Sequence, residues 1–218
     1  MTPNPNFKTR LRLALTDLDA SIRAKAARDV GILKDHDSVS QLIVALVDSN
    51  TDVRTNAVDA LGNIGSRQAV EPLIAALKDE SIVIHAVYAL GQIGDSSAMP
   101  ALRSFLITDD NKYRFRLAYS LALCGDSPAI DDLDLVCAVS EDPERVILAI
   151  YALETTCKRH PMLVSRIIPI LAGRLGDRRS PRAEALNHLR APRWVDREAN
   201  RSLRNIGTPE AIQALSLL

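Results

Sequence analysis

The stretch AVDALGNIGSRQAVEPLIAAL, residues 57–77, decides the fold of this protein because the chain repeats it. The pattern returns as AVYALGQIGDSSAMPALRSFL at residues 86–106 and as ANRSLRNIGTPEAIQAL at residues 199–215. A period of about 30 residues is typical of stacked-repeat proteins, in which a neighbouring unit covers the apolar face of each unit. The chain is therefore expected to fold as an array of similar units.

Each unit has the sequence pattern of a helical hairpin. Apolar residues recur at spacings of three and four residues, which predicts an amphipathic first helix; in one unit they are Val53, Ala57, Ala60, Leu61 and Ile64. A glycine followed by Ser or Asp then ends that helix in a left-handed turn and caps a second, shorter helix. The sequence predicts an all-α fold, a right-handed α-solenoid of stacked helical hairpins.

The repeats also predict the organisation of the chain as a single solenoid over residues 1–218. The period breaks once, in the last third, where GDRRSPRAEALNHLRAPR (176–193) adds residues and an extra helix is expected near 181–189. The expected parts are an N-terminal cap at 1–16, regular repeats at 17–47, 48–78, 79–107 and 108–137, a divergent repeat at 138–176, an insertion at 177–193 and a terminal repeat at 194–218.

Charge and cysteine content limit the classes of function. Lys and Arg together number 27, as do Asp and Glu, which argues against a surface built throughout for nucleic acid or anionic lipid. No apolar run approaches the roughly 20 residues of a membrane span. The 3 cysteines lack metal-site spacing and are expected to be reduced, partly buried thiols. We expect a cytoplasmic protein with neither a membrane nor a nucleic acid as its partner.

Motifs for catalysis or metal binding are weak in this sequence. The triplets Gly94-Asp95-Ser96 and Gly125-Asp126-Ser127 look like a hydrolase nucleophile motif, but they recur at the expected inter-helix turn, where helix capping accounts for both. The four histidines are scattered one per region and form no His-Glu pair. We therefore predict no catalytic residue and no metal ligand.

A line of apolar and aromatic residues is expected on the outward side of the first helices. At 100° per residue, the positions opposite the core stripe are occupied by Ile84, Tyr88, Phe115, Tyr119 and Tyr151. One interpretation is that these residues anchor a partner protein, since aromatic residues dominate protein interfaces. The other is that each ring packs between neighbouring first helices and seals the ridge. The sequence leaves both open.

A basic cluster continues this line in the last repeat. It consists of Arg193, Arg197, Arg201 and Arg204, and residues 158–218 hold 12 Lys and Arg against 5 Asp and Glu. Such a cluster suits an acidic protein surface, a carboxylate-bearing ligand or nucleic acid. The alternative is a solvated helix face.

The stretch DVRTNAVDALGNIGSRQAVEPLIAAL, residues 52–77, resembles the HEAT-like repeat of the phycobilisome-lyase (PBS lyase) group of HEAT-repeat proteins. Val83 replaces the motif's arginine in the third repeat. The resemblance implies a solenoid of HEAT-like hairpins and one candidate activity: a phycobilin lyase or chromophore-handling protein that acts on a light-harvesting biliprotein subunit. Under that alternative a bilin is the ligand and a bilin carrier protein is the partner.

The favoured function is a non-catalytic protein-binding scaffold or adaptor, because a repeat array presents an extended surface and no catalytic constellation converges in it. The residues expected to contact the partner protein are Ile84, Tyr88, Phe115, Tyr119, Tyr151, Arg193, Arg197, Arg201 and Arg204. No cofactor is expected for this function.

Overall fold

The computed structural model describes residues 5–108, 113–140, 142–173 and 193–216, and all regular structure in these ranges is helical. The predicted fold class, an all-α solenoid of stacked helical hairpins, is confirmed. The helix predicted near 181–189 lies outside the described residues. The chain divides into two compact units, Met1–Asp109 and Asp110–Leu218, here called unit 1 and unit 2. The expectation of one continuous solenoid stays a prediction.

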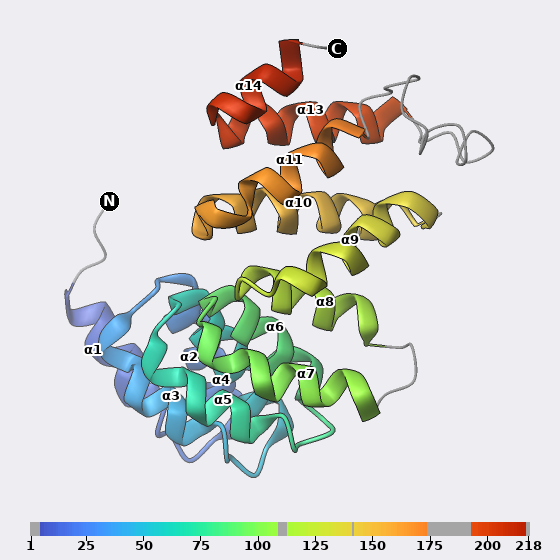
Figure 1. The fold of residues 1–218 in the computed structure, drawn as a ribbon. Helices are drawn as coiled ribbons and strands as arrows, with labels where there is room; N and C mark the ends of the chain where they lie inside the picture. Colours follow the sequence, from blue (N-terminus) through green and yellow to red (C-terminus); the bar gives the residue numbers. More distant parts are fainter. Residues whose placement is uncertain (1–4, 109–112, 141, 174–192, 217–218) are drawn as a thin grey trace. The chain divides into compact units, whose positions relative to one another are not determined.

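Unit 1 consists of a leading helix and three hairpins, each with a first helix, a 3-10 turn and a second helix (Figure 1). The first helices α2, α4 and α6 pack against one another in chain order. Its elements are α1 (Pro5–Ala14), α2 (Ala20–Ile32), η1 (His36–Ser38), α3 (Val39–Ala45), α4 (Thr51–Ile64), η2 (Arg67–Ala69), α5 (Val70–Ala76), α6 (Val83–Ile93), η3 (Ser96–Ala98) and α7 (Met99–Thr108).

Unit 2, over its described residues, also consists of three pairs of a first and a second helix. Its first helices are α8, α10 and α13, and α10 packs against both of the others. The second helices are α9, α11 and α14. The elements are α8 (Arg114–Leu123), α9 (Ser127–Val139), α10 (Pro143–Arg159), η4 (Pro161–Leu163), α11 (Val164–Gly173), α13 (Arg193–Ile206) and α14 (Pro209–Ser216).

The predicted glycine turns form, with positive φ at Gly65, Gly94 and Gly125. The predicted side-chain cap forms at Asp95 but not at Ser66 or Asp126, which precede their helices without a capping hydrogen bond from the side chain. Gly94 closes α6 with φ +70°, and the Asp95 side chain then accepts the backbone N–H of Ser97 to begin η3. In the Gly94-Asp95-Ser96 triplet, the glycine thus ends one helix and the aspartate caps the next, as the helix-capping interpretation predicts. Periodic leucines fill the core between the helices; those that are fully buried include Leu42, Leu61, Leu73, Leu90, Leu102, Leu121, Leu133, Leu153 and Leu203.

Lys34 stands where the later repeats have glycine, at the left-handed end of α2. Its φ is +47°, and it is the one non-glycine residue with positive φ in the described part of the chain. Its N–H donates to the carbonyl of Gly31 at 3.2 Å, and the next N–H, of Asp35, reaches the carbonyl of Val30 at 3.2 Å. The αL region costs a side-chain-bearing residue about 1–2 kcal/mol.

The Lys34→Gly substitution is expected to stabilise unit 1. The relieved backbone strain outweighs the added entropy of the unfolded chain, for a net gain of about 0.5–1 kcal/mol. Chemical denaturation of both proteins measures it. Lys25→Gly, at an exposed site within α2, is the matched control and should cost about 1 kcal/mol. Equal losses at both sites would contradict the strain argument.

The first helices of unit 1 approach so closely that glycine is required between them. A Cβ built on Gly31 of α2 would lie 2.7 Å from the Cα of Ala60 in α4, and one built on Gly62 of α4 would lie 2.9 Å from the Cα of Ala89 in α6. Both contacts are to backbone, which a rotamer change cannot relieve. The glycine of the repeated ALG triplet therefore serves helix packing.

The leading helix α1 is held to the first repeat by a buried carboxylate. Asp35, 3% exposed, accepts hydrogen bonds from Arg12 Nε at 2.7 Å, Arg12 Nη2 at 2.9 Å, Ser38 Oγ at 2.7 Å and Lys8 Nζ at 3.2 Å. These donors, Arg12 above all, hold the pKa of Asp35 well below its usual range despite burial. The helix expected to cap the N-terminus is thus attached through ion pairs.

Candidate functional site

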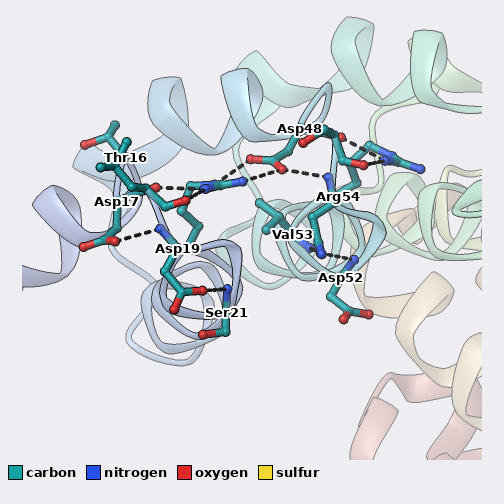
Figure 2. A network of polar contacts seen from close by, with 12 residues as sticks. Thr16, Asp17, Asp19, Ser21, Asp48, Asp52, Val53 and Arg54 are labelled. Atoms are coloured by element: carbon teal, nitrogen blue, oxygen red, sulfur yellow. Dashed lines mark hydrogen bonds and ion pairs between the residues drawn. The ribbon is translucent and has the colours of Figure 1, made fainter.

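Arginine side chains of the first helices α2 and α4 bind aspartates in the loop that leads into the next first helix (Figure 2). Arg23 donates to both carboxylate oxygens of Asp48, at 2.7 and 2.8 Å, and to the carbonyl of Asp17 at 2.8 Å. Arg54 repeats the arrangement with Asp79, at 2.9 Å, and with the carbonyl of Asp48, at 2.8 Å. Hydrogen bonds from Arg23 lower the pKa of Asp48. The arginine of the VR motif thus has a structural role between successive repeats.

Polar side chains of neighbouring first helices in unit 1 pair with one another on the accessible face. Arg28 Nε donates to Asn56 Oδ1 at 3.3 Å, which joins α2 to α4. Asp59 Oδ1 lies 2.8 Å from His85 Nδ1, which joins α4 to α6. Polar groups that already satisfy one another offer little to a partner, because binding would have to replace those contacts.

Helix α10 of unit 2 is well defined by its sequence. Asp142 caps its N-terminus by accepting the backbone N–H groups of Glu144 and Arg145, at 3.0 and 3.4 Å, and Pro143 occupies the first turn. Lys158 and Arg159 lie in its last turn, where cations favour the helix dipole. Its 17 residues make it the longest described helix.

One stripe of α10 exposes a group of large apolar side chains. Ile147, Leu148 and Tyr151 are 38, 43 and 51% exposed, and their spacing of one, three and four residues places them together on one face. Ala149 and Leu153, on the core side, are fully buried. A contiguous exposed apolar group is informative in a way that scattered single residues are not.

Basic side chains lie on the helix next to this stripe. Leu153 of α10 corresponds in the repeat to Leu203 of α13, both fully buried, so Tyr151 corresponds to Arg201 and Ile147 to Arg197. Packed helices lie about 10 Å apart, so equivalent residues on α10 and α13 are neighbours on one side of unit 2. Arg197, Arg201 and Arg204 are all exposed, and Arg201 Nη2 lies 2.6 Å from a carboxylate oxygen of Glu198.

A buried polar contact links α10 to α13 beneath this face. Glu154 of α10, 4% exposed, accepts a hydrogen bond from Ser202 Oγ of α13 at 2.8 Å, and Lys158 Nζ donates to its other oxygen at 2.7 Å. Glu154 stands at the position that holds Gly31 and Gly62 in unit 1, where the helices meet backbone to backbone. At this junction unit 2 therefore has a hydrogen bond to a charged group. It joins α10, which carries the apolar stripe, to α13, which carries the arginines.

The residues of the predicted aromatic line differ in exposure. Ile84 is half-buried and Tyr88 is 38% exposed, both on α6 of unit 1. Phe115 is half-buried on α8, and Tyr151 is exposed on α10. Tyr119 is 9% exposed, and its ring meets that of Phe115 edge to face, with ring centroids 6.5 Å apart. Of the two interpretations of the line, this burial favours packing over partner contact at Tyr119.

The basic cluster is described except at its first member. Arg197, Arg201 and Arg204 are exposed on α13, and Arg204 Nε donates to Asn200 Oδ1 at 2.8 Å. Arg193 begins α13, and its side chain lies outside what the structure describes.

Three residues of this region were missed in the sequence. Ile147 follows Phe115 by 32 residues, the spacing that relates Tyr151 to Tyr119, so the repeat register carried its signal. Leu148 follows Ile147 directly, and Arg116, at the equivalent position of α8, follows Phe115; both are exposed. We call Ile147, Leu148, Tyr151, Arg197 and Arg201, with Arg116 and Arg204 at the edges, the α10 surface.

The chemistry available at the α10 surface is that of binding. Cys157 lies on α10, but burial, together with Glu154, raises the pKa of its thiol to about 12, which keeps it protonated. Cys124 and Cys137 are buried as well. Among the described residues, no group of three His, Cys, Asp or Glu side chains is placed to share a metal ion, and no helix is long and apolar enough to cross a membrane.

Comparison with known proteins identifies the repeats. Residues 8–84 match the family model of HEAT repeats, and residues 83–108 match that of the PBS lyase HEAT-like repeat. No curated protein matches the chain by sequence.

Solved structures share the fold at low identity. The chain is similar to one in the complex of CpcE and CpcF of phycocyanin lyase from Nostoc sp. PCC7120, with a TM-score of 0.61, 20% identity, and coverage of 96% of this chain and 92% of that one. An engineered protein gives a TM-score of 0.52 at 20% identity, covering 93% and 97% of the two chains. A designed armadillo repeat protein gives 0.50 at 16% identity, covering 90% and 98%.

Proposed function

We propose that this chain, whose residues 8–84 match the family model of HEAT repeats and whose residues 83–108 match that of the PBS lyase HEAT-like repeat, is a non-catalytic binding module that captures a partner protein through the α10 surface. The observation that carries the proposal is the exposed apolar stripe of Ile147, Leu148 and Tyr151 on an otherwise regular helix. Burying such a group against a partner is favourable by roughly 25 cal/mol per Å² of apolar surface.

The position of the stripe supports this role. It lies on a helix that is packed on both sides, by α8 and α13, so it is presented on a rigid support and loses little entropy on binding. Tyr151, the most exposed of the three, combines an apolar ring with a hydroxyl group, a combination enriched at protein interfaces.

The test is partner capture by variants of the stripe. The triple substitution Ile147→Ser, Leu148→Ser and Tyr151→Ser is expected to reduce recovery of the specific partner by more than about tenfold, because the apolar contact area is lost. Capture by the tagged protein from native lysate, quantified by mass spectrometry, measures it. The control is Val44→Ser with Val47→Ser, which removes exposed apolar residues of unit 1 and should leave recovery unchanged. A triple variant that folds and captures every wild-type partner would disprove the proposal.

A second candidate is a chromophore-handling protein that acts on a biliprotein subunit. The likeness to a chain of the phycocyanin lyase complex over 96% of this chain favours it. The arginines suit the propionates of a linear tetrapyrrole, and the neighbouring ring of Tyr151 suits its pyrrole rings. Visible absorption of a bilin separates the two candidates. A spectral change on adding this protein, followed by transfer to a carrier cysteine, supports chromophore handling, whereas an unchanged spectrum supports the binding module.

A further inference from the structure

The α10 surface has an apolar centre with cations on both sides. On α13, Arg197 and Arg201 lie beside the stripe and Arg204 lies at the edge; on α8, Arg116 is exposed at the position equivalent to Leu148. Since α10 packs against both helices, these cations flank the apolar side chains within about one interhelical distance, roughly 10 Å.

The carboxylates of the same region are fewer and mostly engaged. Glu154 is buried and bonded to Ser202 and Lys158. Glu198 is partly buried and pairs with Nη2 of Arg201; a guanidinium carries five N–H donors, so Arg201 keeps donors for a second carboxylate. Glu144 is exposed at the start of α10, in the turn that favours an acidic residue. Among the side chains that the structure describes, the exposed charged residues of α8 and α13 are all arginines, whose planar guanidinium matches a carboxylate group.

We propose that the α10 surface recognises an acidic segment of a partner protein, in which large apolar side chains cover Ile147, Leu148 and Tyr151 and neighbouring carboxylates pair with Arg197, Arg201 and Arg116. This inference rests on the proposed protein-binding function and adds the chemistry of the partner. Charge complementarity selects the segment, and the apolar contact supplies most of its affinity. A nucleic acid fits less well, because aliphatic side chains at the centre offer its phosphates nothing.

The direct test uses synthetic peptides of about 20 residues, roughly 30 Å as a helix, which is long enough to cross the three packed helices α8, α10 and α13. The parent peptide carries leucine and phenylalanine on one face of a helix and glutamate elsewhere. One control replaces each glutamate by lysine, and a second replaces each apolar residue by serine. Fluorescence anisotropy with the full chain is expected to show binding of the parent peptide, and binding about tenfold weaker or worse for each control. Affinity for the parent should fall as salt is raised.

Two variants of the protein assign that binding to the surface. Arg197→Gln with Arg201→Gln is expected to weaken binding of the parent peptide about tenfold and to flatten its salt dependence. Arg10→Gln with Lys25→Gln, both exposed in unit 1, removes the same charge elsewhere and should change neither. Circular dichroism checks that both variants fold.

Three results would overturn the inference: equal affinity for the glutamate and lysine peptides, equal effects of the two charge variants, or tighter binding to anionic lipid vesicles than to the parent peptide. These are distinct from failure of the proposed function. If the serine triple variant loses its native partner while the peptides show no preference for acidic residues, the binding module stands and its acidic specificity falls. If partner capture also survives the triple variant, both fall.

Discussion

Replacing Gly31 by alanine is expected to destabilise unit 1 by about 2–3 kcal/mol, the range of overpacked cores. The added Cβ would lie 2.7 Å from the Cα and 2.8 Å from the Cβ of Ala60, so α2 and α4 must move apart. This outcome is opposite to the gain of about 1 kcal/mol that alanine brings to an unhindered helix. Denaturant unfolding monitored by circular dichroism measures the difference.

The matched control is Asn63→Ala, at an exposed position of α4, which should change stability by less than about 0.5 kcal/mol. The double variant Gly31→Ala with Ala60→Gly should recover only part of the loss, because the Ala60 Cα remains in contact. Unchanged or increased stability of Gly31→Ala alone would show that the two helices are not in tight contact.

The second large effect is expected at the buried carboxylate that holds α1. Asp35→Asn keeps the size of the side chain but removes the charge that Arg12 and Lys8 contact. At neutral pH we expect a loss of about 2 kcal/mol, the range of hydrogen bonds to charged groups. Guanidinium would screen the ion pairs, so urea unfolding is the appropriate measurement.

The pH dependence of this effect follows from the lowered pKa of Asp35 in the folded protein. A depressed carboxyl pKa contributes stability that is complete above the unfolded value, about 4, and is lost as pH falls toward the folded value. The difference in unfolding free energy between wild type and Asp35→Asn should therefore be constant from about pH 5 to about pH 7, above the unfolded pKa. It should shrink below about pH 4. Asp37→Asn is the control, because Asp37 also accepts from Arg12, at 2.8 Å, but is exposed. A difference that grows as pH falls would contradict this account.

The α10 surface was predictable only in part. Tyr151, Arg197 and Arg201 were placed on the outward face by helical periodicity alone, and the structure exposes all three. Tyr119 has the same register position as Tyr151 but is buried against Phe115. Periodicity gives the direction in which a side chain leaves its helix, whereas its exposure depends on which neighbouring side chains cover it.

What the sequence by itself determined is the repeating architecture. The spacing of leucines such as Leu61 and Leu90, and the glycine turns at Gly65 and Gly94, follow from local rules that hold within one hairpin. The tertiary structure alone decided the contacts between hairpins. Glu154 and Ser202 lie 48 residues apart, and no local pattern pairs them. Their hydrogen bond, like the approach of Gly31 to Ala60, exists only once helices distant in sequence are packed together, because burial and charge pairing depend on neighbours that the fold supplies.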